Sequence, residues 1–382
     1  MSKLERPNKP LAAYVYEDAG SYVAEDKNGR LITSDADFGT MFNDLMTALG
    51  SVGIVGIEGG TTYTYGVTPT VTGSGSYNEK PIEIIGVGDG AYPVLEPDDG
   101  VVGFDYEHGV NLHLHRLHID QSTSGAGVPA LRALNDGGNA YLENGAWLAK
   151  FGDLILEGGV SGQNLWYAED MEWFHIYGRI IAKGGTGVHP IKFVNTAAAE
   201  FSYFESLVTG QVFVTTTGAN TVAMELSGDS SKPLNLLNWK GQFWLRNSGG
   251  SDGTIGLKTG YVQRSEIGGL HIENMNILLQ QNTGTQSVRF NFGNSYSFNC
   301  NGTNKIGCDM NSGYNNTVDN FLFYFGGLTA VAIDDENDDA NAPHRYSNLT
   351  LQGSGGVCTY DLGSSAMTDT PVYRRLGSGT FP

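Results

Sequence analysis

A short pattern of apolar and small residues recurs along the last third of the chain. Ile255-Gly-Leu-Lys, Ile306-Gly-Cys-Asp and Val331-Ala-Ile-Asp share it, and Val357-Cys-Thr-Tyr is a weaker fourth copy. The last two intervals between copies are nearly equal, and the first, from Ile255 to Ile306, is close to twice either of them. We therefore predict one further copy between Ile255 and Ile306 and a regular repeat of short strands.

A second set of apolar runs follows three of these copies at a similar short interval, at Leu270-His-Ile, Phe321-Leu-Phe and Leu349-Thr-Leu. The segments between the runs consist largely of Gly, Asn, Ser, Thr and Asp, which favour turns. Because each such repeat can bury its apolar side chains only against its neighbours, the pattern predicts a solenoid. The predicted fold class is all-β, a single-stranded right-handed parallel β-helix that spans residues 61–360.

Between Ser34 and Gly50 the apolar period changes to that of a helix. One stripe contains residues at i, i+3, i+4, i+7 and i+11, which are Phe38, Met41, Phe42, Leu45 and Leu49. Asp35 or Asp37 can cap the start of this helix, and Gly50 lies where it would end. A solenoid exposes its core and a strand edge at its open end, so we expect the helix to act as an N-terminal cap.

The regions outside the solenoid divide into three parts. We expect residues 1–33 to form an N-terminal arm with short strands, since two apolar runs flank the turn residues 17–20. Those runs predict a hairpin or two short extended pieces. The capping helix and a first strand occupy residues 34–60, and residues 361–382 are expected to form a C-terminal tail.

The first quarter of the chain contains a series of short motifs. They are Ala13-Tyr-Val-Tyr, Ser21-Tyr-Val-Ala-Glu-Asp, Asn28-Gly-Arg, Gly53-Ile-Val-Gly-Ile, Gly60-Thr-Thr-Tyr and Pro81-Ile-Glu-Ile-Ile-Gly-Val-Gly. From Ala12 to Leu95 this series resembles the leader of pectate-lyase-like β-helix proteins of archaeal viruses, haloarchaea and bacteriophage tailspikes. In that superfamily a capping helix precedes a strand, a Gly-Thr-Tyr turn and a coil that ends in Gly-x-Gly.

The resemblance implies a virion surface protein, a spike or fibre associated with a capsid or a tail. Such a protein would attach to a host surface glycan or glycoprotein, form a homotrimer, and dock onto other virion proteins through its N-terminal arm. The superfamily also contains enzymes, so a polysaccharide hydrolase or lyase on the same scaffold is the alternative.

Composition changes this picture in two respects. With 22 basic against 41 acidic residues and a net charge of −19, the chain is poorly suited to bind nucleic acid, which requires clustered Lys and Arg. The acidity is consistent with simple solubility or with a halophilic setting, where salt screens self-repulsion. There is no secretory signal and no apolar run of membrane-spanning length, so we expect synthesis in a host cytoplasm and no membrane insertion.

Two carboxylates and three tryptophans are the first candidate site. On a strand, Asp170 and Glu172 would share one face, and such a pair is what glycoside hydrolysis requires. The alternative is an acidic outer face with the neighbouring aromatic residues packed inside. For attachment, the candidate glycan contacts are the tryptophans Trp166, Trp173 and Trp244.

A dense run of acidic residues follows the strand predicted at 331–333. Asp334 and Asp335 are a second pair of candidate catalytic carboxylates. Together with Asp338 and Asp339 they are also weak candidates for Ca²⁺ ligands, since calcium prefers carboxylate oxygens. The spacing is not that of an EF-hand, and a solvated acidic loop is the alternative. We otherwise predict no cofactor.

Three histidines lie close together in one predicted strand region. His113 and His115 stand at i and i+2, hence on one face, and His118 follows. A zinc site is one interpretation of this group. The other is a polar outer face opposite the apolar side chains of Leu112 and Leu114.

Overall fold

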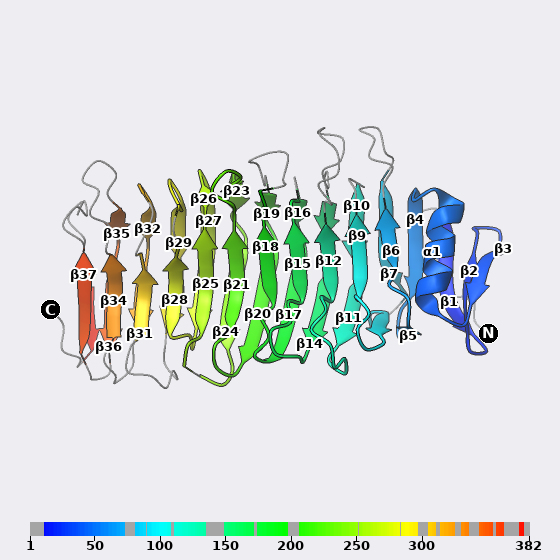
Figure 1. Cartoon of the computed structure of the whole chain (residues 1–382), viewed down its shortest axis with the longest axis horizontal. Coiled ribbons are helices and arrows are strands. Elements are labelled where there is room, and N and C mark those ends of the chain that lie inside the picture. The colour runs from blue at the N-terminus through cyan, green and yellow to red at the C-terminus, as the bar shows by residue number, and fades with distance from the viewer. Residues whose placement is uncertain are drawn as a thin grey trace.

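The computed structural model describes most of the chain. The described residues are 11–72, 81–88, 90–107, 111–134, 149–171, 174–197, 206–250, 252–282, 284–296, 305–310, 314–324, 330–335, 344–353, 357–362 and 374–377. In this part the chain forms one elongated stack of strands that lie across the long axis, and its two ends lie at opposite ends of the stack (Figure 1). The described residues therefore form an all-β parallel solenoid with one short helix, as predicted.

The strands stack in three parallel ladders, to each of which successive coils contribute. Ladder 1 contains β4 (Gly53–Glu58), β7 (Ile82–Val87), β10 (Leu112–His115), β13 (Ala149–Phe151), β16 (Phe174–Ile176), β19 (Ser206–Val208), β23 (Leu237–Trp239), β27 (Glu266–Glu273), β29 (Arg289–Phe292), β32 (Thr317–Asp319) and β35 (Arg345–Ser347).

Ladder 2 lies next to ladder 1, and the long strand β27 belongs to both. It contains β5 (Thr62–Tyr65), β8 (Val94–Pro97), β11 (Leu117–Gln121), β14 (Leu154–Gly158), β17 (Arg179–Thr186), β20 (Gln211–Thr217), β24 (Gln242–Asn247), β30 (Asn294–Tyr296), β33 (Leu322–Tyr324), β36 (Thr350–Gly353) and β38 (Arg374–Gly377).

Ladder 3 forms a separate sheet. It contains β6 (Thr70–Thr72), β9 (Phe104–Glu107), β12 (Leu131–Leu134), β15 (Trp166–Glu169), β18 (Ile191–Val194), β21 (Val222–Ser227), β25 (Ile255–Gly260), β28 (Ile277–Gln281), β31 (Lys305–Asp309), β34 (Ala330–Asp335) and β37 (Cys358–Leu362). A two-stranded sheet of β22 (Leu234–Asn235) and β26 (Val262–Gln263) completes the solenoid.

The recurring pattern of the last third of the chain forms ladder 3. Ile255 pairs with Ile277, Ile277 with Ile306, and Ile306 with Val331. Strand β28 is therefore the copy predicted between Ile255 and Ile306. Ile277 lies nearer in sequence to Ile255 than to Ile306, because the connections between ladders differ in length while the pairing register is kept.

The fourth predicted copy is offset from the true register. Val331 pairs with Thr359 and not with Val357, which is 42% exposed. The apolar residue that continues the interior row is Cys358, which is fully buried opposite Ala330. In the sequence, either Val357 or Cys358 could align with strand β34. The structure buries Cys358 and exposes Val357, so the cysteine is the residue that continues the interior.

Inward side chains from the three ladders fill the interior of the solenoid. In the middle coils this core is aromatic: the ring centroids of Phe151 and Trp166 are 4.7 Å apart, those of Trp166 and Phe193 5.1 Å, and those of Phe174 and Phe193 5.3 Å. All four rings are almost fully buried. Each contributes a large apolar area and edge-to-face contacts with its neighbours.

Ladders 1 and 2 meet at a tight corner where glycine is required. A Cβ atom on Gly210 would lie 2.0 Å from the carbonyl oxygen of Gly178, and one on Gly241 would lie 2.2 Å from that of Gly210. Any side chain at these positions would push adjacent coils apart. This corner explains part of the high glycine content, 54 of 382 residues.

The N-terminal end of the described chain is an antiparallel meander of β1 (Ala13–Asp18), β2 (Ser21–Glu25) and β3 (Leu31–Asp35). Strand β1 also pairs in parallel with β4, which joins the meander to ladder 1. The predicted hairpin is confirmed. Residues 1–10, the rest of the predicted arm, lie outside the described residues.

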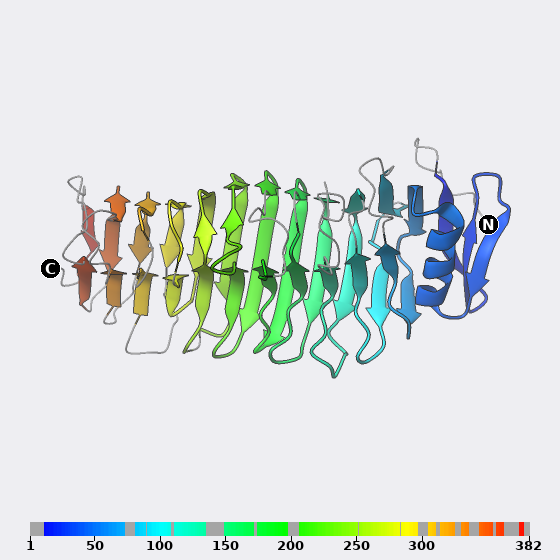
Figure 2. The ribbon, with the colours of Figure 1, turned by 45° about the horizontal axis from the view of Figure 1, so that its top comes forward.

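The single predicted helix is confirmed as α1 (Phe38–Leu49). Asp37 caps it, since its Oδ1 accepts a hydrogen bond of 2.7 Å from the backbone N–H of Thr40. Gly50 ends it in the left-handed conformation at φ 61°. The helix lies beside the first coils at the N-terminal end (Figure 2), with Phe38 4.9 Å from the ring of Tyr63.

The C-terminal segment predicted as a tail contains a further strand. Strand β38 pairs in parallel with β36 and so extends ladder 2. The remaining residues of that segment outside β37 and β38 are not among those described.

We predict that the apolar face of α1 stabilises the end of the solenoid. Phe38→Ala should lower the free energy of unfolding by about 3–5 kcal/mol, because the fully buried ring contacts Tyr22, Tyr63 and Tyr65. Thr47→Ala, on the exposed side of the same helix, should change it by about 0.5 kcal/mol or less. Urea denaturation followed by circular dichroism measures the stability of both variants. Equal unfolding midpoints would show that the apolar face of α1 does not stabilise the solenoid.

Candidate functional site

An outward row of mostly apolar side chains runs along ladder 2. Parallel pairing in register aligns one residue from each coil, and these residues are His118, Ile155, Ile181, Phe213, Trp244 and His271. Neighbouring strands lie about 4.8 Å apart, so such side chains touch across coils. The tryptophan is the most exposed member, at 42%.

Three rings of this row form a continuous aromatic surface, here called the Trp244 platform and defined as Phe213, Trp244 and His271. The ring centroids of Phe213 and Trp244 are 6.0 Å apart, and those of Trp244 and His271 are 4.6 Å apart. A shallow hollow of about 220 Å³ lies against Phe213 and Trp244. The ring planes of Phe213 and Trp244 make an angle of 34° and those of Trp244 and His271 one of 67°, so the platform offers an apolar surface mainly through the exposed tryptophan ring.

Polar groups border the platform on the next outward row. Glu273 lies between two partners: its Oε1 is 2.6 Å from Nε2 of His271, and its Oε2 is 3.7 Å from Nε of Arg246. Arg246 is half-exposed, whereas Glu273 is buried. The guanidinium can therefore donate hydrogen bonds to a ligand that contacts the Trp244 ring, and the nearby carboxylate of Glu273 partly balances its charge.

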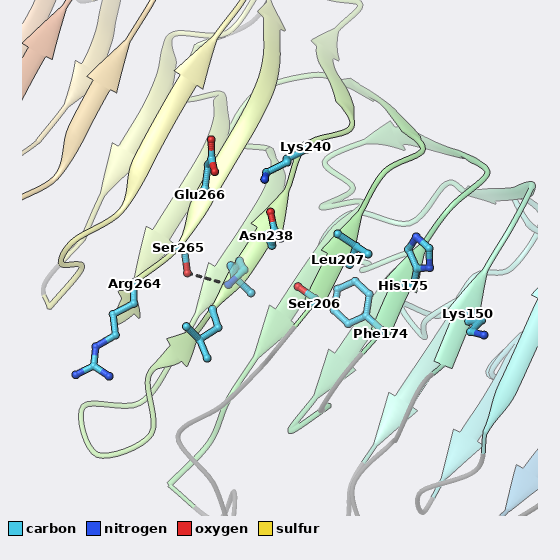
Figure 3. Close-up of a pocket in the computed structure, with 12 residues that line it drawn as sticks. Lys150, Phe174, His175, Ser206, Leu207, Asn238, Lys240, Arg264, Ser265 and Glu266 are labelled. Carbon is cyan, nitrogen blue, oxygen red and sulfur yellow. Dashed lines mark hydrogen bonds between the residues drawn. The ribbon is translucent and has the colours of Figure 1, made fainter.

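A groove of about 800 Å³ lies on ladder 1, on the neighbouring face of the same coils (Figure 3). Its lining residues are Lys150, Phe174, His175, Ser206, Leu207, Leu236, Leu237, Asn238, Lys240, Arg264, Ser265 and Glu266. Lys150 lies toward one end and Arg264 toward the other.

The groove is a basic region on an acidic protein. Burial lowers the pKa of His175, so its imidazole is neutral at pH 7. The positive charge therefore comes from Lys150, Lys240 and Arg264, and Glu266 is the one carboxylate among the lining residues that the structure describes. The floor is held rigidly, since Nε1 of buried Trp239 donates a 2.7 Å hydrogen bond to Oγ of Ser206.

The three predicted tryptophan contacts have different positions. Trp244 is exposed and forms the platform described above. Trp166 is fully buried between Phe151 and Phe193, so the prediction that it contacts a glycan was wrong. On strand β15 the alternation of side chains turns it inward. Trp173 lies outside the described residues, as does Glu172.

Asp170 accepts hydrogen bonds from Thr196 of the next coil with both of its carboxylate oxygens. It is 4% exposed, its Oδ1 accepts a 2.6 Å hydrogen bond from the N–H of Thr196, and its Oδ2 accepts one of 2.7 Å from the threonine hydroxyl. Strand β15 ends at Glu169, and Asp170 adopts a φ of 55°. The predicted strand alternation through Asp170 was therefore wrong, because a left-handed residue breaks it.

The second predicted pair of carboxylates divides between two sides of one strand. Strand β34 extends to Asp335, which is buried and accepts a 2.6 Å hydrogen bond from the hydroxyl of Tyr346. Asp334 is partly buried and pairs in register with Asp309. Adjacent residues on a strand point to opposite faces, so Asp334 and Asp335 do not converge. The predicted calcium ligands Asp338 and Asp339 lie outside the described residues.

The predicted histidine group also divides. His113 and His115 belong to β10 of ladder 1, whereas His118 lies across the corner on β11 of ladder 2. His118 instead lies near Asp120 and Glu157. One possible ligand atom from each of these three residues lies within 4.8 Å of the other two.

Sequence reasoning missed the neighbours of Trp244, although a signal for them was present. Phe213, Trp244 and His271 are each the middle residue of an apolar-x-apolar run. Such a residue points outward when its two neighbours point into the core. Aligning the runs Val212–Val214, Phe243–Leu245 and Leu270–Ile272 would have placed the three rings in one row. The groove on ladder 1 had no such signal, because several of its strands are very short.

No helix in the described part of the chain is long and apolar enough to cross a membrane. The chain matches no protein-family model, no curated protein and no solved structure in the comparisons made.

We predict that Asp170 has a structural role. Asp170→Ala leaves the Thr196 N–H and hydroxyl without this acceptor and should lower the free energy of unfolding by about 1–3 kcal/mol. Asp170→Asn keeps one acceptor oxygen and should have a smaller effect. Denaturant unfolding at neutral pH measures the free energy of unfolding of both variants. If both are as stable as the wild type, Asp170 does not have this structural role.

The same site has a defined pH dependence. Burial raises the pKa of Asp170 above its ordinary value of 3.8, so the folded state binds this proton more tightly than the unfolded state. The contribution of Asp170 to stability therefore falls as the pH rises from 3.8 through the folded pKa. The stability of Asp170→Asn relative to the wild type should increase across that range, and a constant difference in thermal midpoints would overturn this expectation.

Proposed function

We propose that this chain is a glycan-binding spike or fibre of a virion surface, which attaches to a host through the Trp244 platform. The observation that carries the proposal is the exposed ring of Trp244, which contacts the rings of Phe213 and His271 on the adjacent strands. Arg246 lies beside this platform on the same strand as Trp244. Binding sites combine an apolar surface with a few placed polar groups. Sugars present both an apolar C–H face and hydroxyl groups, so they suit this combination.

Packing of the solenoid interior does not account for the exposed ring. Trp244 points away from the core, and its neighbours Phe243 and Leu245 already fill the interior at this point of β24. Tryptophan is enriched among residues that dominate binding energy at interfaces. Since the ring contacts Phe213 and His271 on the adjacent strands, it loses little conformational freedom when a ligand binds.

The virion role rests on the leader between Ala12 and Leu95, which resembles that of viral β-helix spikes. We propose that the solenoid is right-handed, that α1 acts as its N-terminal cap, and that three copies pack into a homotrimer. The N-terminal arm would dock onto other capsid or tail proteins. A long, stiff and acidic body is suited to hold a binding surface away from a particle.

The alternative, a polysaccharide-degrading enzyme, requires two carboxyl groups that face one groove. Of the carboxylates named from the sequence, Asp170 binds Thr196 and Asp335 binds Tyr346. The groove on ladder 1 offers Glu266 alone among its described lining residues. Attachment without cleavage therefore fits these side chains better.

We predict that Trp244→Ala abolishes most glycan binding. A microarray of neutral, uronate-containing and sulfated oligosaccharides identifies a ligand for the wild type, and calorimetry then measures the affinity of the best one. The substitution should weaken binding at least tenfold, about 1.4 kcal/mol, because it removes the stacking surface. Tyr177→Ala removes an equally exposed ring two coils away and should leave the affinity unchanged.

Two results would contradict this proposal. One is the absence of any glycan ligand for the wild type, and the other is equal affinity of Trp244→Ala and the wild type.

We predict a homotrimer for the full chain at both low and high salt. Sedimentation equilibrium should give about three times the chain mass of 40.9 kDa. The monomer mass at micromolar protein concentration would contradict the spike architecture, although glycan binding by Trp244 would still stand.

A further inference from the structure

A cluster of possible metal ligands lies on the outer face of ladder 2, three coils from Trp244. His118 and Asp120 stand at i and i+2 on β11, and Glu157 stands opposite Asp120 on β14. Their possible ligand atoms all lie within 4.8 Å of one another, and all three side chains are partly buried. The two strands are fixed by five consecutive register pairs, so the cluster is rigid at its base.

The imidazole of His118 places an unpartnered nitrogen beside the carboxylate of Glu157. Its Nε2 atom is inaccessible to solvent and has no hydrogen-bond partner. The same atom lies 3.6 Å from Oε1 of Glu157, which is beyond hydrogen-bonding distance. A buried nitrogen without a partner is unfavourable, and a cation bound between the two atoms would offset this.

We propose that His118, Asp120 and Glu157 bind a divalent first-row metal ion of the zinc class. Zinc bonds of about 2.0–2.2 Å place adjacent tetrahedral ligand atoms about 3.4 Å apart, and the His118–Glu157 separation of 3.6 Å is close to this value. An imidazole ligand favours Zn²⁺, Ni²⁺ or Cu²⁺ over Ca²⁺ or Mg²⁺. Three protein ligands leave a fourth position for water or a ligand oxygen.

Lys183 competes with the metal ion in this site. Its ammonium group forms an ion pair with Oε1 of Glu157, on the adjacent strand β17. Because the lysine side chain is 53% exposed, moving it into solvent loses little free energy. Without a metal, the lysine offsets part of the charge of the two carboxylates. With one, it must leave Oε1, so its removal should strengthen metal binding.

A purely structural role for the cluster makes a different prediction. If Glu157 and Lys183 form only a surface ion pair beside a histidine, neither the wild type nor Lys183→Met will bind zinc at a defined site. The two interpretations therefore differ in whether zinc binds at a defined site and in whether Lys183→Met strengthens that binding.

The test is calorimetric titration of the full-length, tag-free chain with Zn²⁺ after treatment with a chelator. We expect one ion per chain, affinity at least tenfold weaker for His118→Ala and Glu157→Gln, and several-fold stronger for Lys183→Met. Glu273→Gln changes a second close histidine–carboxylate pair, His271 and Glu273, and should leave zinc binding unchanged. Circular dichroism establishes that each variant is folded.

Cobalt provides a second readout that does not depend on stability. Co²⁺ in a tetrahedral site with nitrogen and oxygen ligands has intense visible absorption, which should appear in the wild type and be lost in Glu157→Gln. The proposal is overturned if neither the wild type nor Lys183→Met shows saturable binding. It is equally overturned if His118→Ala and Glu157→Gln bind zinc as the wild type does, since the ion then lies elsewhere.

Discussion

Parallel pairing of the backbone between successive coils is the interaction on which the rest of the molecule depends. Each coil is too small to bury its own apolar side chains, and its backbone N–H and C=O groups find partners mainly in the coils before and after it. Keeping the register aligns equivalent positions of every coil. The interior rows are therefore continuous and apolar, and the exterior rows bring together side chains that are distant in sequence.

The candidate sites follow from these exterior rows. Phe213, Trp244 and His271 belong to three successive coils and are far apart in sequence, yet their rings form one surface because their strands pair in register. The same pairing places Asp120 opposite Glu157. Function in such a fold arises from side chains in adjacent coils, and the stiff sheet beneath them provides the precise positions that binding needs.

The corners between ladders and the ends of the solenoid have structural requirements that strand pairing alone does not meet. Glycines such as Gly210 and Gly241 let coils approach closely where ladders 1 and 2 meet. At the N-terminal end, α1 and the meander of β1 to β3 lie where the regular stacking stops. The acidic composition leaves the groove of ladder 1, with its lysines and arginine, as a local basic region.

The sequence by itself determined the local elements and the repeat. The helical period of the apolar stripe specified α1, because that pattern depends on residues within a few turns of one another. The spacings of the copies at Ile255, Ile306 and Val331 predicted a repeat with one further copy, because each coil must present apolar side chains to the same interior. Only the tertiary structure decided which side chains face outward. Trp166 is buried and Trp244 is exposed, although both lie in short strands beside apolar residues. The pairing register decides the face on which each strand residue lies, and a left-handed φ at Asp170 ends the alternation of faces after β15.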